Sequence, residues 1–152
     1  MRTALLSDVD AITELINAAF QAEKPFFDGD RVNREKVREF MRTGQFLLAE
    51  DSEGLASCVY LEVHEGRGYV GLLSVDPPKQ GTGLGRKLMY AAEEYFRSAG
   101  CTGVDLRVIS PRTVLPAFYR RLGYVETGTA PFPSEVQSKV RGHYIIMSKE
   151  FV

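Results

Sequence analysis

The sequence predicts an α/β domain with a mixed, mostly antiparallel sheet and helices on both of its faces. Two observations support this: the order of the expected elements, and one helix that links two strands. Along the chain the order is β-α-α-β-β-β-α-β-α-β-β. Three strands joined by short turns run antiparallel, whereas a crossover helix returns the chain to a parallel neighbour. We therefore expect a sheet with one parallel pair at its centre.

The first third of the chain predicts one short strand and two helices. Residues 3–6 are the strand candidate. Apolar residues then recur at helical spacing from Val9 to Phe20, and Ser7 with Asp10 has the spacing of a capping box. Asn33 can cap a second, shorter helix that Gly44 ends.

The rest of the chain predicts six strands and two helices. Hairpin-turn residues separate the first three strands, and Gly100 follows the longer helix as its C′ residue. Pro116 lies within the shorter helix and is expected to delay its start or to kink it. The expected strands span residues 45–50, 55–64, 69–75, 103–109, 124–128 and 143–151, and the helices residues 84–99 and 112–124.

Composition and charge are those of a soluble globular protein. Of 152 residues, 44% are hydrophobic and 26% are charged. No apolar run reaches the roughly 18 residues of a membrane span, and the chain start lacks a signal-peptide core. The net charge of -1 gives no basic field for nucleic acid. We expect one cytoplasmic domain, residues 1–152, without nucleic-acid or membrane partners; a homodimer stays open as an alternative to a monomer.

Few side chains suit a metal site or a cysteine nucleophile. Cys58 lies in an apolar run and Cys101 follows a glycine, and neither has a metal-ligand spacing. The two histidines are His64 and His143, so a metal site would need mainly carboxylate ligands. We expect two reduced thiols and no metal.

The stretch VDPPKQGTGLGRKLM, residues 75–89, is a glycine-rich loop that opens a helix. A Walker A loop needs Gly-Lys-Ser/Thr, but Arg86 follows Gly85 here. A dinucleotide fingerprint needs a third glycine, and Arg86 occupies that position too. What remains is Q-x-x-G-x-G, formed by Gln80, Gly83 and Gly85. Its backbone N–H groups and the helix dipole suit a pyrophosphate without a metal, while a tight turn without a ligand is the alternative.

Three blocks in this order resemble the GNAT superfamily of acyl-CoA-dependent N-acyltransferases. They are GLLSVDP at 71–77, the Q-x-x-G-x-G loop, and FYRRLGY at 118–124, and the element order matches that family over nearly the whole chain. The resemblance implies acetyl-CoA as co-substrate and an amine as acceptor. It further implies that the coenzyme is bound by the backbone of one strand and by the loop: Leu73, Ser74, Val75, Gln80, Gly81, Thr82, Gly83, Leu84, Gly85 and Arg86.

The same resemblance implies direct attack of the amine on the thioester, with no acyl-enzyme. A bulge on the strand containing Leu73 to Val75 would separate two parallel strands and present N–H groups to the acetyl oxygen. Tyr119 matches the general acid that protonates the leaving thiolate; the alternative is a core aromatic residue. Glu62, in the apolar setting VYLEV, is the nearest candidate base; a surface carboxylate, Glu23 or a water chain are the alternatives.

The acceptor is the least determined part of the site. Its specificity is expected from residues 20–44 and 130–142, which contain Phe26, Phe27, Asp28, Phe132 and Arg141. Many family members have an asparagine about seven residues before the tyrosine. Here that position is Arg112, which we expect to contact substrate in a different way. A coenzyme A-binding or sensor module without catalysis is the alternative function.

Overall fold

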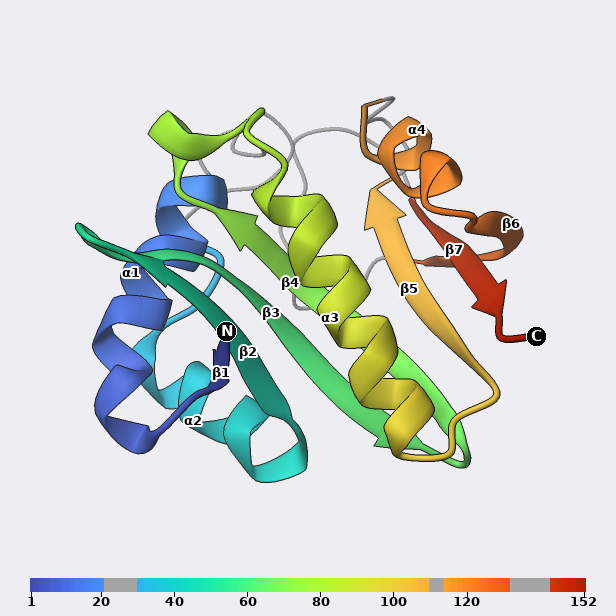
Figure 1. Cartoon of the computed structure of the whole chain (residues 1–152), viewed down its shortest axis with the longest axis horizontal. Coiled ribbons are helices and arrows are strands. Elements are labelled where there is room, and N and C mark those ends of the chain that lie inside the picture. Colours follow the sequence, from blue (N-terminus) through green and yellow to red (C-terminus); the bar gives the residue numbers. More distant parts are fainter. Residues whose placement is uncertain (21–29, 110–113, 132–142) are drawn as a thin grey trace.

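The structure is a computed structural model, and it describes residues 1–20, 30–109, 114–131 and 143–152. Its strands form one seven-stranded sheet in the order β1-β2-β3-β4-β5-β7-β6 (Figure 1). The strands are β1 (Arg2–Thr3), β2 (Gln45–Asp51), β3 (Gly54–His64), β4 (Arg67–Val75), β5 (Gly103–Ile109), β6 (Val125–Pro131) and β7 (His143–Glu150). The helices are α1 (Val9–Phe20), α2 (Arg34–Thr43), α3 (Leu84–Ser98) and α4 (Val114–Arg121), with short 3₁₀ turns η1 (Leu6–Asp8) and η3 (Pro77–Lys79).

Strand directions confirm the expected mixed sheet. β4 and β5 run parallel, and all other described pairs are antiparallel. The helix α3 makes the crossover between β4 and β5, so the glycine-rich loop follows the central strand as predicted. The predicted order of helices and strands is confirmed.

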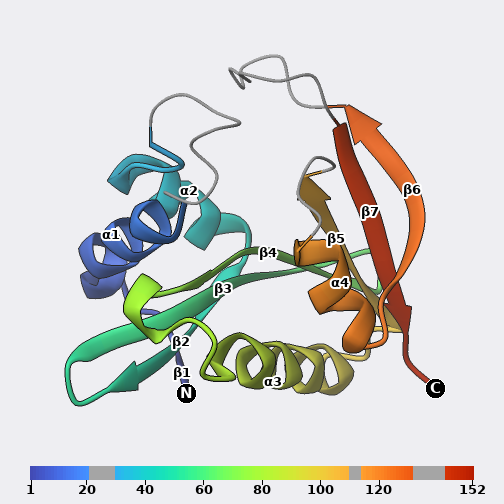
Figure 2. The ribbon, with the colours of Figure 1, turned by 90° about the horizontal axis from the view of Figure 1, so that it is seen from above.

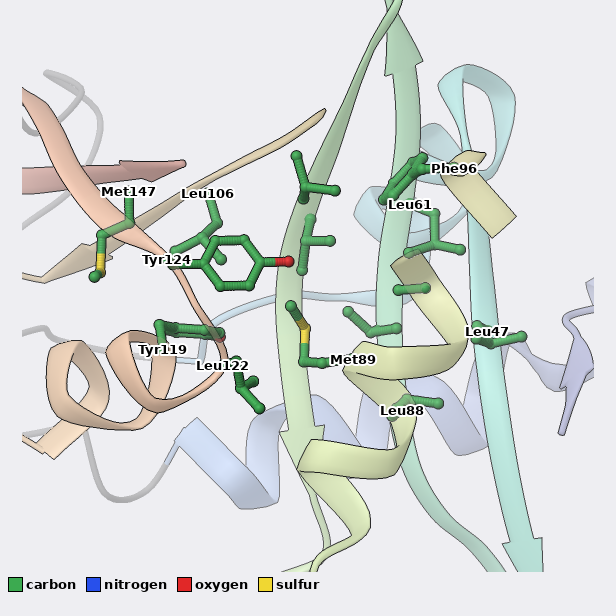
Figure 3. Close-up of a cluster of buried hydrophobic side chains, with 14 of the residues drawn as sticks. Leu47, Leu61, Leu88, Met89, Phe96, Leu106, Tyr119, Leu122, Tyr124 and Met147 are labelled. Carbon is green, nitrogen blue, oxygen red and sulfur yellow. The ribbon is translucent and has the colours of Figure 1, made fainter. Parts of the chain in front are cut away.

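Helices cover both faces of the sheet, and each face has its own apolar core. In Figure 2, α1 and α2 lie on the opposite side of the strands from α3. On the first side Ile12, Ile16 and Val37 pack against Phe46, Cys58 and Tyr60 of the strands. On the second side α3 and α4 enclose a larger cluster, part of which is drawn in Figure 3: Leu47, Leu61, Leu88, Met89, Phe96, Leu106, Tyr119, Leu122, Tyr124 and Met147.

The start of the chain differs from the sequence prediction. The first strand ends at Thr3, and η1 precedes α1. The expected capping box of Ser7 and Asp10 is wrong, because Asp8 is the residue that caps: its carboxylate accepts from the Leu5 N–H at 2.7 Å. Two hydrogen bonds from Arg2, each 2.8 Å, also reach Asp8 and hold the pKa of that carboxyl at about 2. The local cap therefore begins at Leu5, and an ion pair with Arg2 supports it.

The predicted start and end of α2 and the predicted end of α3 are confirmed, whereas α4 ends at Arg121, three residues earlier than predicted. The Asn33 side chain accepts from the Lys36 N–H at 2.8 Å and so caps α2, which ends at Gly44. Gly100 has φ +82° after α3, the left-handed conformation of a C′ residue. Pro116 lies in the first turn of α4, where a missing N–H costs the helix no internal hydrogen bond.

Among the described helices, none is both long enough and apolar enough to cross a membrane.

Candidate active site

The central strand β4 contains a bulge near its carboxyl end. Across β3, Cys58 pairs with Ser74 but Tyr60 pairs with Gly71, so β4 has one more residue than its partner over this stretch. Leu72 in the bulge has φ +54°, a strained conformation for a branched side chain. Bulges redirect backbone N–H groups and end strand pairing. The bulge expected on this strand is present, between Gly71 and Ser74.

β4 and β5 are paired over a short stretch and then separate. Their parallel register covers Gly68 to Val70 opposite Val104 to Leu106, although both strands continue beyond it. At the amino ends Arg67 bridges the pair: it donates to both oxygens of Asp105, at 2.8 and 2.9 Å. The pair is therefore closed at one end and open at the other, and the bulge lies at the open end.

The glycine-rich loop follows β4 and begins α3 with two left-handed glycines. Gly81 has φ +80° and Gly83, the N-cap, has φ +86°. A Cβ at either position would meet no atom within 4 Å, so these positions need glycine for backbone conformation and the space beside them is open. The first internal bond of α3 runs from the Lys87 N–H to the Gly83 carbonyl at 3.1 Å. The N–H groups of the first turn before it have no partner within the helix.

Side chains of the loop hold its shape. The Gln80 amide donates to the Val75 carbonyl at 3.2 Å, and the Thr82 hydroxyl donates to the Lys79 carbonyl at 2.5 Å. The Lys79 ammonium lies 2.6 Å from an Asp51 carboxylate oxygen. This contact raises the pKa of Lys79 and lowers that of Asp51. The Lys79 ammonium is thus engaged in an ion pair with Asp51, at the end of β2.

Two other cations stand at the start of α3. The Arg86 guanidinium lies over the ring of Tyr90, 5.5 Å from its centre, and donates to the Tyr90 hydroxyl at 3.1 Å. Lys87 is exposed and has no ion pair within the described part of the chain. Arg86 and Lys87 are therefore better placed than Lys79 to meet a phosphate at this helix end.

Gly85 joins α3, β4 and α4. A Cβ on Gly85 would lie 3.5 Å from Cζ of Phe118, 3.7 Å from Cγ2 of Val75 and 3.9 Å from Cδ2 of Leu73. The loop, the bulged strand end and the helix α4 therefore meet at one place. These are the three blocks that the sequence analysis singled out.

Tyr119 lies in the core between α3 and α4. Its side chain is 5% exposed, and its ring makes edge contacts with Phe118 and Tyr124, with centres 5.1 and 5.9 Å away. Figure 3 shows it beside Leu122 and Tyr124. Its place in the core is shown, and its role as general acid stays a prediction.

A buried polar network supports the end of α4. Glu93 of α3 is 2% exposed; one of its carboxylate oxygens accepts from Lys149 at 2.9 Å and the other from the Tyr124 hydroxyl at 3.0 Å. Lys149 also donates to the Leu122 carbonyl at 2.8 Å, just beyond α4. The sequence analysis missed this network. Its signal is the position of Glu93, four residues after Met89 on the buried stripe of α3.

Glu62 and Tyr119 lie on opposite sides of the sheet. Glu62 is half-buried on β3, opposite Tyr69 of β4. It alternates in phase with Tyr60, so it points to the side covered by α1 and α2. Tyr119 belongs to the cluster on the α3 side. If both side chains take part in catalysis, they must approach the reacting group from opposite faces of the sheet.

Cys58 has no features of a nucleophile. Its side chain is fully buried beneath α1 and α2. Burial raises the pKa of the thiol to about 12, although a hydrogen bond with Ser74 opposes the shift. The thiolate that catalysis would need is therefore strongly disfavoured at neutral pH.

Several sequence-predicted residues lie outside the described residues. They are Phe26 and Phe27, assigned to the acceptor, with Arg112, and also Glu23, Asp28, Phe132 and Arg141. Within the described residues, no group of three or more His, Cys, Asp or Glu side chains could hold a metal ion.

Residues 9–124 match the acetyltransferase (GNAT) family. The chain belongs to this family. A mycothiol acetyltransferase of Saccharopolyspora erythraea is 31% identical over 126 residues, which are 80% of this chain and 42% of that protein. A mycothiol acetyltransferase of Actinosynnema mirum is 31% identical over 121 residues, 77% of this chain and 41% of that protein. This GNAT chain spans less than half the length of these curated relatives.

Solved structures have the same fold. The ribosomal-protein-S18-alanine N-acetyltransferase of Escherichia coli superposes with a TM-score of 0.79 over 98% of this chain and 91% of its own, at 18% identity. The protein yncA of Salmonella typhimurium, solved with its cofactor acetyl-CoA, has a TM-score of 0.76 over 98% and 91%, at 19% identity. At these identities the likeness is one of fold.

Acetyl-CoA is the co-substrate of this GNAT fold. The loop fits such a molecule for reasons visible in the chain itself. Gly81 and Gly83 leave open space beside a helix start whose N–H groups lack helical partners. Separation of β4 from β5 beyond Val70 leaves backbone at the open end without a strand partner on that side.

Proposed function

We propose that this GNAT chain transfers the acetyl group of acetyl-CoA to a primary amine by direct attack, without an acyl-enzyme. The observation that carries the proposal is the meeting of the glycine loop, the bulged end of β4 and α4 around Gly85. The loop binds the pyrophosphate through the residues from Gln80 to Arg86, mainly through backbone N–H groups. Residues 1–152 act as one catalytic domain, since all described strands join one sheet.

The bulge supplies electrostatic stabilisation in this proposal. The backbone of Leu73, Ser74 and Val75 directs N–H groups toward the thioester oxygen, which becomes negative as the amine attacks. The strained φ of Leu72 supports this role, because strain kept at one residue commonly accompanies a functional backbone arrangement. A carbon–nitrogen bond forms, and the carbon–sulfur bond breaks with its electrons on sulfur.

Three proton transfers complete the reaction. Tyr119 donates a proton to the departing thiolate, and its packing on Phe118 keeps it near Gly85. The proton that the nitrogen loses as the amide forms restores the Tyr119 hydroxyl. Glu62 accepts a proton from the ammonium group of the acceptor before attack, because only the neutral amine has a lone pair. Its place on the α1–α2 side fits an acceptor that enters from there while the coenzyme lies toward α3 and α4.

The experiment is a panel of amines incubated with acetyl-CoA, with free thiol measured over time. Small amines, amino acids, an aminoglycoside, mycothiol precursors with a free amine and peptides with free N-termini cover the acceptor classes. We expect thiol release that depends on both the amine and the protein. If the chain binds coenzyme A by calorimetry but releases thiol with none of these amines, the sensor-module alternative replaces the enzyme.

A further inference from the structure

A row of polar side chains crosses the sheet on the side of α1 and α2. Tyr69 of β4 lies opposite Glu62 of β3 in the antiparallel register. On the other side it lies opposite Asp105 of β5 in the parallel register, and Arg107 follows two residues later on the same face. Tyr144 of β7 is opposite Ile109, diagonal to Arg107. This row, Glu62, Tyr69, Arg107 and Tyr144, is called the β3–β7 polar row below.

Within the described residues Arg107 has no acidic partner, unlike several other arginines. Arg67, Arg97 and Arg120 each contact a carboxylate. Asp105, the nearest acid on β5, is already paired with Arg67 and accepts from the Ser148 hydroxyl at 2.7 Å. Arg107 is exposed and forms no hydrogen bond or ion pair with any other residue in the described ranges. Its guanidinium group therefore has no ion-pair partner among the described residues, although Glu62 lies in the same row.

Charged groups near Tyr69 act on its hydroxyl in opposite directions. Burial raises the pKa of Tyr69, and the negative charge of Glu62 raises it further. The positive charges of Arg107 and Arg31 oppose the shift. Arg31 is likewise exposed and lacks an acidic partner among the described residues. The sheet register thus places Glu62 and Arg107 on the same face as the half-buried Tyr69, on the two strands beside it.

We propose that the acceptor is a small amine that also carries an anionic group, a carboxylate or a phosphate, and that Arg107 binds this group. This inference rests on the proposed acetyl transfer and names its substrate class. The guanidinium fork matches two oxygens of a carboxylate or phosphate at once. Glu62 receives the ammonium end of the same molecule, and Arg31 adds positive charge around the anion.

The coenzyme's own phosphates are a poor match for Arg107. They are expected at the start of α3, beyond the carboxyl end of β4 and on the other side of the sheet. Arg107 lies within β5 and points to the side of α1 and α2, because the alternate residues Leu106 and Val108 enter the α3-side cluster. The positive charge of Arg107 therefore lies on the face of the sheet where we expect the acceptor, the one covered by α1 and α2.

The test compares matched acceptors on wild-type protein and on Arg107→Gln. Each pair consists of an anionic amine and its neutral analogue: an amino acid and its amide, phosphoethanolamine and ethanolamine, glucosamine 6-phosphate and glucosamine. We expect higher kcat/KM for at least one anionic member. In Arg107→Gln that preference should fall roughly 10- to 100-fold through KM, as for loss of a hydrogen bond to a charged group. The KM for acetyl-CoA and the rates with neutral amines should not change.

Two further variants serve as controls. Arg121→Gln removes an exposed arginine of α4 that has no acidic partner among the described residues, and the acceptor preference should survive. Arg107→Lys keeps the charge but not the fork, so it should restore only part of the preference. It also replaces Arg107→Gln if the latter does not fold.

Outcomes of this test are separable from those of the proposed function. Neutral amines that react as well as their anionic partners, or a preference that survives Arg107→Gln, overturn the inference while acetyl transfer stands. The carboxylate and phosphate pairs tell the two anion sources apart. If no amine reacts, calorimetry of the same anionic amines with the coenzyme A-bound protein decides. Binding that weakens in Arg107→Gln supports the anion site, and absence of binding overturns it.

Discussion

The two ends of the β4–β5 pair are built from different interactions. At the amino ends the strands share a parallel register, and Arg67 of β4 forms an ion pair with Asp105 of β5. At the carboxyl ends the register is lost, β4 bulges at Leu72, and a glycine loop follows. Side-chain ion pairs stabilise the closed end, whereas backbone conformation shapes the open end. Substitutions at the open end should therefore change rate or binding, and those at the closed end should change stability.

The largest effect is expected at the open end, from Tyr119→Phe. The variant keeps the ring that packs on Phe118 and Tyr124, so the free energy of unfolding should change by about 1 kcal/mol or less. Turnover should fall about 10- to 10³-fold, because a positioned acid contributes substantially but a thiolate also leaves unaided. Steady-state kinetics with an accepted amine measure this. A folded variant with wild-type turnover would make Tyr119 a core residue only.

Glu62→Gln tests the boundary between the two ends, since Glu62 lies beside the last paired residues of β4. A general base removes a proton from the acceptor, so its loss should slow turnover and alter the pH–rate profile. The variant should react about 10- to 10²-fold more slowly, with unchanged affinity for coenzyme A. A pH–rate profile identical to that of the wild type would remove Glu62 as the base.

Gly83→Val and Gly66→Val compare the two ends directly. Both glycines have positive φ, +86° and +77°, and neither has an atom within 4 Å of an added Cβ. Strain in the backbone should therefore lower the free energy of unfolding of each variant by about 1–3 kcal/mol. Only Gly83→Val should also weaken coenzyme A binding, by about tenfold or more, because Gly66 is in the turn at the closed end. Titration calorimetry and far-UV circular dichroism report the two quantities; equal affinities would contradict the pyrophosphate assignment.

Asp105→Asn should affect stability and leave function unchanged. Arg67 lowers the pKa of Asp105 in the folded protein, with a smaller contribution from Ser148. The stabilisation is therefore complete above the unfolded pKa of about 4 and is lost as pH falls through the lower folded pKa. About a third of each side chain is exposed, so we expect a loss of about 1 kcal/mol or less at pH 7. The difference in urea unfolding between the two proteins should shrink steadily as pH is lowered below about 4; a constant difference would exclude the ion pair as its cause.

The smallest effect concerns the cations near the loop. Lys87→Gln should weaken coenzyme A binding about two- to threefold, and added salt should weaken wild-type binding in the same direction. Lys79→Gln is the matched control, because Lys79 is engaged by Asp51 and should contribute little to the phosphates. Salt-independent binding, or a larger loss in the control, would reverse this assignment.

The sequence predicted those parts of the fold that depend on neighbouring residues. Gly83 and Gly100 bound α3, and the crossover it makes requires a parallel β5. The interactions that join distant segments were not predictable in this way. Arg67 and Asp105 are 38 positions apart and Glu93 and Lys149 are 56, and no local pattern connects either pair.

In the candidate site, too, local features were predictable from the sequence and long-range ones were not. The loop and the position of the bulged strand followed from motifs, because glycine conformation and helix starts are local properties. That Glu62 lies on the opposite side from Tyr119 became clear only from the sheet, since a residue's side depends on strand register and alternation. That Arg107 has no ion-pair partner among the described residues likewise depends on long-range contacts, because Arg67 already pairs with Asp105.

Burial of both cysteines has a practical consequence for measuring this protein. Cys58 is 0% exposed and Cys101 is 8% exposed, and the chain has no others. A colorimetric thiol reagent added to the native protein should thus report released coenzyme with little background from the protein. The same reagent in denaturant should count two thiols per chain. Before substrates are added, the ratio of the native reading to the denatured reading gives the unfolded fraction of any variant, and the remainder is the folded fraction.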